Sequence, residues 1–97
     1  MELLFVVSSK EGGEIAKPLV AACVRKGVPW GCFFTNDGVK ALTDSSFCDL
    51  LHESAKEAIV CAQSWKDFMK KLPCPMEIGS QFDHAGLIAK ADKVISL

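Results

Sequence analysis

Short apolar runs alternate along the chain with segments whose apolar residues recur every three or four positions. The first run, Leu3 to Val7, is continuous and has the length of a strand, as expected for a strand that is covered on both faces. Further strands are predicted at residues 28–35, 58–62, 75–79 and 93–97, and helices at residues 15–26, 39–42, 47–53, 64–72 and 82–91. This alternation predicts an α/β fold of βαβ units, with a mostly parallel five-stranded sheet and right-handed crossovers.

Two segments between these elements are predicted to be turns. The sequence SSKEGGE at residues 8–14 has turn composition, so the first helix is expected to begin near Ile15 and to hold Pro18 in its first turn. The sequence NDG at residues 36–38 is also a turn signal, with Asp37 as a weak candidate for a site residue. Ser64 and Asp67 have capping-box spacing and predict the start of the third major helix.

The composition limits the class of protein. The chain has 97 residues, which is enough for one domain spanning residues 1–97 and one core. The formal net charge is −1 and no basic stripe is present, so nucleic acid is not expected as a partner. No apolar run is long enough to span a membrane. The chain has five cysteines, an odd number with no C-x-x-C pair, which argues against a zinc site and a disulfide framework and favours reduced thiols in a cytoplasm.

Four segments together resemble the DsrE/DsrF-like family, which includes the TusD-type sulfur-relay subunits. They are the apolar first strand, CFFTNDGV at residues 32–39, IVCAQS at residues 59–64 and ADKVISL at residues 91–97. The resemblance implies a flavodoxin-like three-layer fold with helices on both faces of the sheet, assembled into trimers or hexamers. It also implies a cysteine that accepts sulfur as a persulfide at the end of the third strand, where Cys61 stands, without a metal or organic cofactor.

Cys61 is therefore the first candidate for a catalytic residue. With the strand order 2-1-3-4-5, it would lie beside Ser8 and Ser9 at the carboxyl edge of the sheet, where ligands bind in open parallel sheets. It also precedes a helix, whose N–H groups and positive dipole end stabilise a thiolate. The alternative is a buried cysteine that fills space in the core. His84 near the start of the last helix is the second candidate, as a proton acceptor or as a group that orients the persulfide, or else a solvated helix residue.

The remaining chemistry-bearing residues are assigned to other roles. Cys23 and Cys32 are expected in the core, Cys48 too far from Cys61 for a disulfide, and Cys74 and His52 at the opposite edge. In the first loop, Glu11 and Glu14 would repel a phosphate, which disfavours a nucleotide or flavin site. The side chains of Trp30, Phe33 and Phe34 lie on a strand predicted at the sheet edge, where they would form an oligomer interface unless helices cover them.

Two hypotheses follow for function. In the first, the protein is a sulfur carrier that transfers persulfide sulfur through Cys61, with sulfur donor or acceptor proteins as partners. In the second, it is a non-catalytic structural or binding subunit of the same fold in a homo- or hetero-oligomer. The position of Cys61 favours the first hypothesis. The second is favoured by the lack of basic residues directly after Cys61, where Ala62, Gln63, Ser64 and Trp65 follow.

Overall fold

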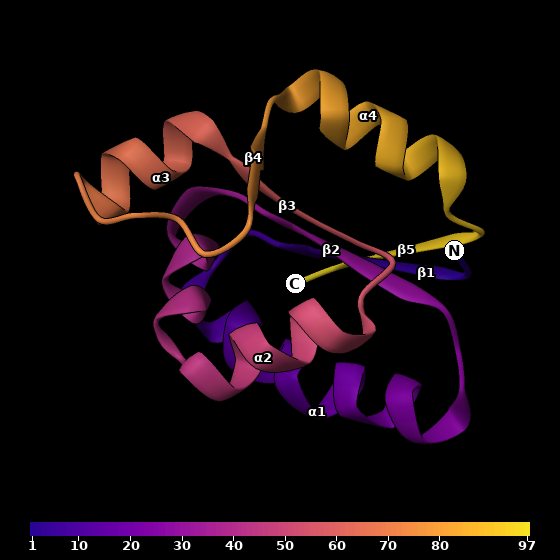
Figure 1. Ribbon diagram of the computed structural model, residues 1–97. Coiled ribbons are helices and arrows are strands. Elements are labelled where there is room, and N and C mark those ends of the chain that lie inside the picture. Colours follow the sequence, from indigo (N-terminus) through magenta and orange to yellow (C-terminus); the bar gives the residue numbers. More distant parts are fainter.

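The computed structural model describes residues 1–97 as alternating strands and helices around one sheet (Figure 1). The strands are β1 (Leu3–Val7), β2 (Trp30–Phe34), β3 (Glu57–Cys61), β4 (Glu77–Gly79) and β5 (Lys93–Ser96). The helices are α1 (Lys10–Lys26), the 3-10 helix η1 (Asn36–Thr43), α2 (Ser45–Ser54), α3 (Ala62–Met69) and α4 (Gln81–Lys90). The predicted order of elements is confirmed, and every strand pair is parallel.

The order of the strands across the sheet is β4-β3-β2-β1-β5, so the predicted order 2-1-3-4-5 is wrong. Side chains of α1, η1, α2 and α3 pack into one cluster with Phe5, Phe34 and Val60. Because right-handed crossovers on one face always step in the same direction, these connections place β1 to β4 in sequence. A second cluster includes Phe33 and Ile59, and α4 is the only helix that packs against it, through Leu87. The crossover through α4 therefore returns the chain to the far side of β1.

The second strand lies inside the sheet and not at its edge. It pairs with β1 on one side and β3 on the other, and Trp30, Phe33 and Phe34 are at most 1 % exposed. Helices and neighbouring strands cover the aromatic side chains, so the interface predicted on them is wrong.

The first helix begins at Lys10, well before the predicted start at Ile15. The hydroxyl of Ser9 accepts a hydrogen bond from Gly12 N and caps the helix, and Pro18 consequently lies in the helix interior. A Cβ atom on Gly12 would lie 2.5 Å from the carbonyl carbon of Leu97. The glycine that suggested a turn is therefore required by close packing of the helix against the end of β5.

The third helix also departs from its predicted bounds. It ends at Met69, several residues before Pro73. Trp65 and Met69 are buried, but Phe68 and Leu72 are 42 % and 58 % exposed, so only half of the predicted apolar face reaches the core. None of the helices is both long and apolar enough to cross a membrane.

Candidate functional site

Cys61 lies where adjacent strands send their following helices to opposite faces of the sheet. It is the last residue of β3, which continues directly into α3, and its neighbour in β4 is Gly79, which leads into α4. Trp65 of α3 belongs to one core cluster and Leu87 of α4 to the other. Ligands of open parallel sheets bind outside the carboxyl ends of the strands. Cys61 lies at this edge, although next to β4 and not beside β1.

The environment of Cys61 on the β2 side consists of hydroxyl groups. Thr35 Oγ1 and Ser64 Oγ lie 3.3 Å apart, and Ser64 Oγ accepts a hydrogen bond of 2.7 Å from Asn36 N. Ser64 is buried and does not cap α3, whose N-cap position is Cys61 without a side-chain cap. The predicted capping box of Ser64 and Asp67 is therefore wrong. The Ser64 hydroxyl is instead directed at the segment that follows β2, where it contacts Thr35 and Asn36.

These groups favour the thiolate form of Cys61. Burial raises the pKa of the Cys61 thiol, but hydrogen bonds from the Ser64 hydroxyl, the backbone N–H groups of Ser64 and Gln63, and the Thr35 hydroxyl outweigh burial and hold the pKa below its ordinary value. Burial raises the pKa of the other four thiols. Because the thiolate is the reactive nucleophile, Cys61 is the thiol suited to chemistry near neutral pH.

On the β4 side, Gln81 connects Cys61 with His84. The Nε2 atom of Gln81 lies 3.9 Å from Cys61 Sγ, and its Oε1 atom lies 3.1 Å from His84 Nδ1. No hydrogen bond joins His84 to Cys61 directly. The His84 ring stacks on Phe33, with the ring centroids 4.3 Å apart and the planes 4° from parallel, and its Nε2 atom is buried without a partner. The structure therefore brings both predicted site residues to one place, with a glutamine between them.

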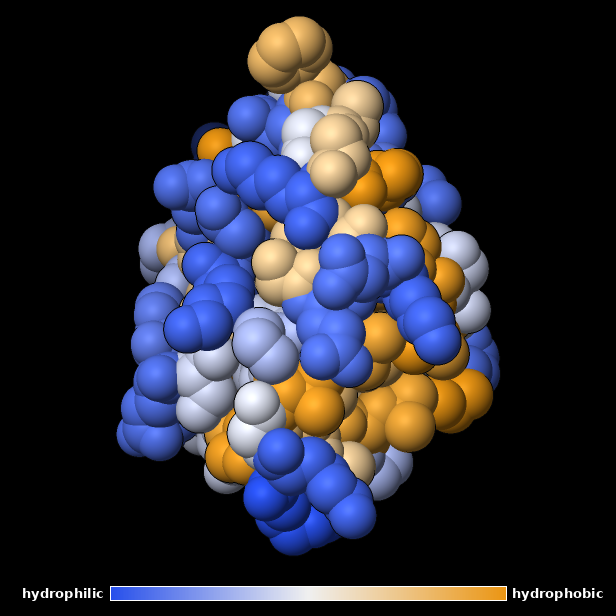
Figure 2. Space-filling view, turned by 90° about the vertical axis from the view of Figure 1, so that its right-hand side faces the viewer, coloured by the Kyte–Doolittle hydropathy of each residue, from blue (hydrophilic) through white to orange (hydrophobic).

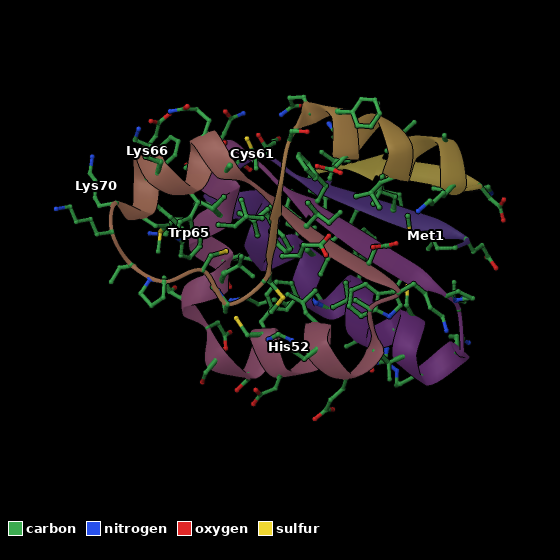
Figure 3. All side chains as sticks on the ribbon, turned by 45° about the horizontal axis from the view of Figure 1, so that its top comes forward. Met1, His52, Cys61, Trp65, Lys66 and Lys70 are labelled. Atoms are coloured by element: carbon green, nitrogen blue, oxygen red, sulfur yellow. The ribbon has the colours of Figure 1, made fainter.

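Figure 3 shows Cys61 between the starts of α3 and α4, whereas His52 lies apart from it on α2 and Met1 lies toward the other end of the sheet. Ser8, expected beside Cys61, instead donates a hydrogen bond to the carbonyl of Leu97 at the end of β5. Asp37 lies in η1, which replaces the predicted turn, and is half-buried. Lys66 on α3 and Lys70, directly after its end, are exposed and point outward in Figure 3.

The other four cysteines are free thiols in or against the larger core cluster. Cys23 and Cys32 are buried, as predicted for core residues. Cys48 is buried as well and donates a hydrogen bond from Sγ to the carbonyl of Leu42 at 3.2 Å. Cys74 packs on the edge of the same cluster and is partly exposed. No group of three or more His, Cys, Asp or Glu side chains could hold a metal ion.

The largest surface hollow, about 490 Å³, lies away from Cys61 at the amino ends of the strands, where Met1, Lys56 and Glu57 line it. Its wall carries charges of both signs, including Glu2, Asp92 and Lys90. Neither Cys61 nor His84 lines it. No surface hollow is lined by Cys61, Gln81 or His84, so the site is not an enclosed cavity.

The sequence pattern did not indicate that Thr35, Ser64 and Gln81 are parts of this site. One signal was available for Gln81, because Ser80 and Asp83 have capping-box spacing and form a complete capping box in the structure. That box fixes the start of α4 at the carboxyl edge, with Gln81 as its first residue. No comparable signal identifies Thr35, whose role depends on β2 lying next to β3.

Comparison of the chain with models of known protein families finds no match, and comparison with curated proteins finds none either. The interpretation of the site therefore depends on its own geometry.

Proposed function

We propose that the protein is a sulfur carrier in which Cys61 accepts and passes on persulfide sulfur. The observation that carries the proposal is the placement of Cys61 at the carboxyl edge of the sheet, between the starts of α3 and α4, within a set of hydroxyl and N–H donors that lowers the pKa of its thiol. The proposal agrees with the resemblance of this chain to DsrE/DsrF-like proteins. On this proposal the fold is flavodoxin-like with three layers, but its strand order is β4-β3-β2-β1-β5 and not 2-1-3-4-5.

The transfer step follows from the chemistry of the thiolate. Cys61 attacks the terminal sulfur of a donor persulfide, so that a new S–S bond forms at Sγ while the S–S bond of the donor breaks. The donor leaves as a thiolate with the electron pair of the broken bond, and the proton remains with the transferred sulfur. The donors at Thr35, Ser64 and Gln63 stabilise the Cys61 thiolate before attack and again when an acceptor takes the sulfur away. The step needs neither a metal nor an organic cofactor.

Intact mass measurement after incubation with a small-molecule persulfide donor tests the proposal. We expect the wild-type protein to gain the mass of one sulfur atom and to lose it on treatment with a dithiol. The Cys61→Ser variant should stay folded and should gain nothing. Cys74→Ser is the matched control, because Cys74 is the most exposed of the other thiols, and it should load like wild type. Equal loading of wild type and Cys61→Ser would refute the proposal.

The alternative of a non-catalytic subunit is favoured by the low exposure of Cys61, which is 8 % exposed and packs with Ile59 and Leu87. If Cys61 is only a core residue, Cys61→Ser should lose roughly 1–3 kcal/mol of stability, because it buries a hydroxyl without full compensation. If Cys61 is a site residue, the loss should be smaller, since Ser64 and Gln63 supply hydrogen-bond partners. Urea unfolding of the same variant therefore separates the two hypotheses.

Assembly into a homo-oligomer stays a prediction, and the family resemblance implies a trimer or hexamer. Because β2 is buried, we propose that the interface lies at the edge formed by α1 and β5. On this side β5 pairs only with β1, and Leu19 and Ile95 line an apolar hollow of about 240 Å³. Ile15 and Val24 on α1 are 53 % and 42 % exposed, and apolar side chains gather at the lower right of Figure 2. Light scattering of wild type and Leu19→Lys tests this surface: we expect an oligomer that the lysine dissociates, and a monomeric wild type would refute it.

A further inference from the structure

We infer that Gln81 is a positioning residue that donates a hydrogen bond to the sulfur carried at Cys61, and that His84 acts by holding the Gln81 amide in the orientation this requires. The inference depends on the proposed function only for the identity of the sulfur species. It replaces a direct role of His84 as the base that deprotonates the thiol.

The backbone around Gln81 fixes where its side chain begins. Gly79 is the register partner of Cys61, and Ser80 caps α4 by accepting hydrogen bonds from Phe82 N and Asp83 N. Asp83 Oδ2 in turn accepts a hydrogen bond of 2.8 Å from Ser80 N. Gln81 therefore starts from a rigid corner, one residue beyond the capped position and directly across from the end of β3.

The hydrogen bond to His84 decides which end of the amide faces the sulfur. Amide oxygens accept hydrogen bonds and amide nitrogens donate them. With Oε1 placed 3.1 Å from His84 Nδ1, the imidazole must carry its proton on Nδ1. The amide nitrogen then points to Cys61 Sγ, at 3.9 Å. The opposite orientation would direct the negative end of the amide dipole at a thiolate, which is unfavourable.

The surroundings of the His84 ring fix its position beside Gln81. The ring is held flat against Phe33, which is fully buried, so its plane is fixed. Its Nε2 atom is buried without a hydrogen-bond partner. The ring is therefore suited to hold Gln81 with Nδ1–H, and its free nitrogen has no contact with Cys61.

The separation of Gln81 and Cys61 also suits a persulfide. The S–S bond is about 2.0 Å long, so a terminal sulfur on Cys61 remains within reach of an amide nitrogen that lies 3.9 Å from Sγ. Gln81 is exposed while Cys61 is buried, so the amide lies on the outer side of the sulfur. From there it can donate a hydrogen bond to the terminal sulfur, once that sulfur has lost its proton to water, until an acceptor arrives.

The test is the pH dependence of alkylation of Cys61 by iodoacetamide, followed by peptide mapping, in wild type, Gln81→Ala, Gln81→Glu and His84→Phe. His84→Phe keeps the stack on Phe33 but cannot hold the amide. We expect Gln81→Ala to slow alkylation about threefold near neutral pH and Gln81→Glu to slow it further, because a carboxylate repels the thiolate. His84→Phe should act in the same direction, and the double variant Gln81→Ala/His84→Phe should be no slower than Gln81→Ala alone. Phe82→Ala, which truncates an exposed neighbour on α4, is the control and should alkylate like wild type.

Two results would overturn the inference. One is a profile in Gln81→Ala that equals wild type. The other is a His84→Phe variant that slows alkylation in the Gln81→Ala background as well, which would show His84 acting on Cys61 without Gln81. Because alkylation needs no sulfur transfer, a protein that never takes up sulfur but shows the expected profiles would refute the proposed function and support the role of Gln81. A protein that takes up sulfur with unchanged profiles would do the reverse.

Discussion

Replacement of Ser64 by alanine should make Cys61 less reactive, because it removes one of the groups that stabilise the thiolate. The Ser64 hydroxyl is the strongest of the hydrogen bonds that lower the pKa of Cys61. The side chain is buried at the start of α3, so no other residue replaces it. The backbone N–H groups of Gln63 and residue 64 and the hydroxyl of Thr35 remain in the variant.

The size of the effect follows from the energy of one charged hydrogen bond. Such a bond contributes about 1.5–3 kcal/mol, and the lower end applies because three donors remain. Since 1.4 kcal/mol corresponds to a tenfold change in an equilibrium constant, the thiolate population below its pKa should fall roughly tenfold. A more basic thiolate attacks faster, with a Brønsted coefficient of about 0.4–0.5, which restores roughly threefold. The net expectation is alkylation that is roughly threefold slower near neutral pH.

The assay is the rate of alkylation of Cys61 measured against pH, together with urea unfolding. Ser64→Ala also leaves Asn36 N without its partner, so we expect a loss of about 1 kcal/mol in the free energy of unfolding. Ser8→Ala is the matched control, because it removes a hydrogen bond of 2.9 Å to Leu97 and costs a similar amount. In the observed strand order, Ser8→Ala should leave the alkylation rate unchanged. An unchanged rate in Ser64→Ala, or an equal decrease in Ser8→Ala, would refute the reasoning.

Two further predictions concern stability. Gly38→Ala should destabilise the fold by about 1–3 kcal/mol, because its Cβ would clash with the carbonyl oxygen of Val7. Gly86→Ala, with open space in the interior of α4, should instead stabilise the fold by up to about 1 kcal/mol. Thermal unfolding of both variants checks this, and effects of the same sign would contradict it. Burial raises the pKa of the Cys32 thiol above its ordinary value of about 8.5. Above that pH the unfolded chain loses a proton that the folded chain keeps. The free energy of unfolding should therefore fall by up to about 1.4 kcal/mol per pH unit. Cys32→Ala should be less stable at pH 7 but should show a shallower fall between pH 8 and pH 10 in urea titrations, and an equal slope would refute the assignment.

Hydrophobic periodicity was sufficient to predict the type and order of most elements. The continuous run from Leu3 to Val7 is buried from Leu4 onward, as expected for a strand with neighbours on both sides and clusters on both faces. Turn and capping signals in the sequence predicted the wrong element where a residue is required by tertiary packing and not by the local backbone. Gly12 suggested a turn, but the helix needs it because the end of β5 passes too close for a side chain.

The position of Cys61 at the end of β3 could be predicted from the sequence alone, because a buried strand followed at once by helical spacing identifies the carboxyl edge of a parallel sheet. Its neighbours could not be predicted, because they depend on which strands lie on either side of β3. Periodicity shows that a helix has an apolar face, but it does not show which face of the sheet that helix covers. The tertiary structure decided this by packing α3 and α4 into different clusters. That choice brought Thr35 to one side of Cys61 and Gln81, with His84, to the other.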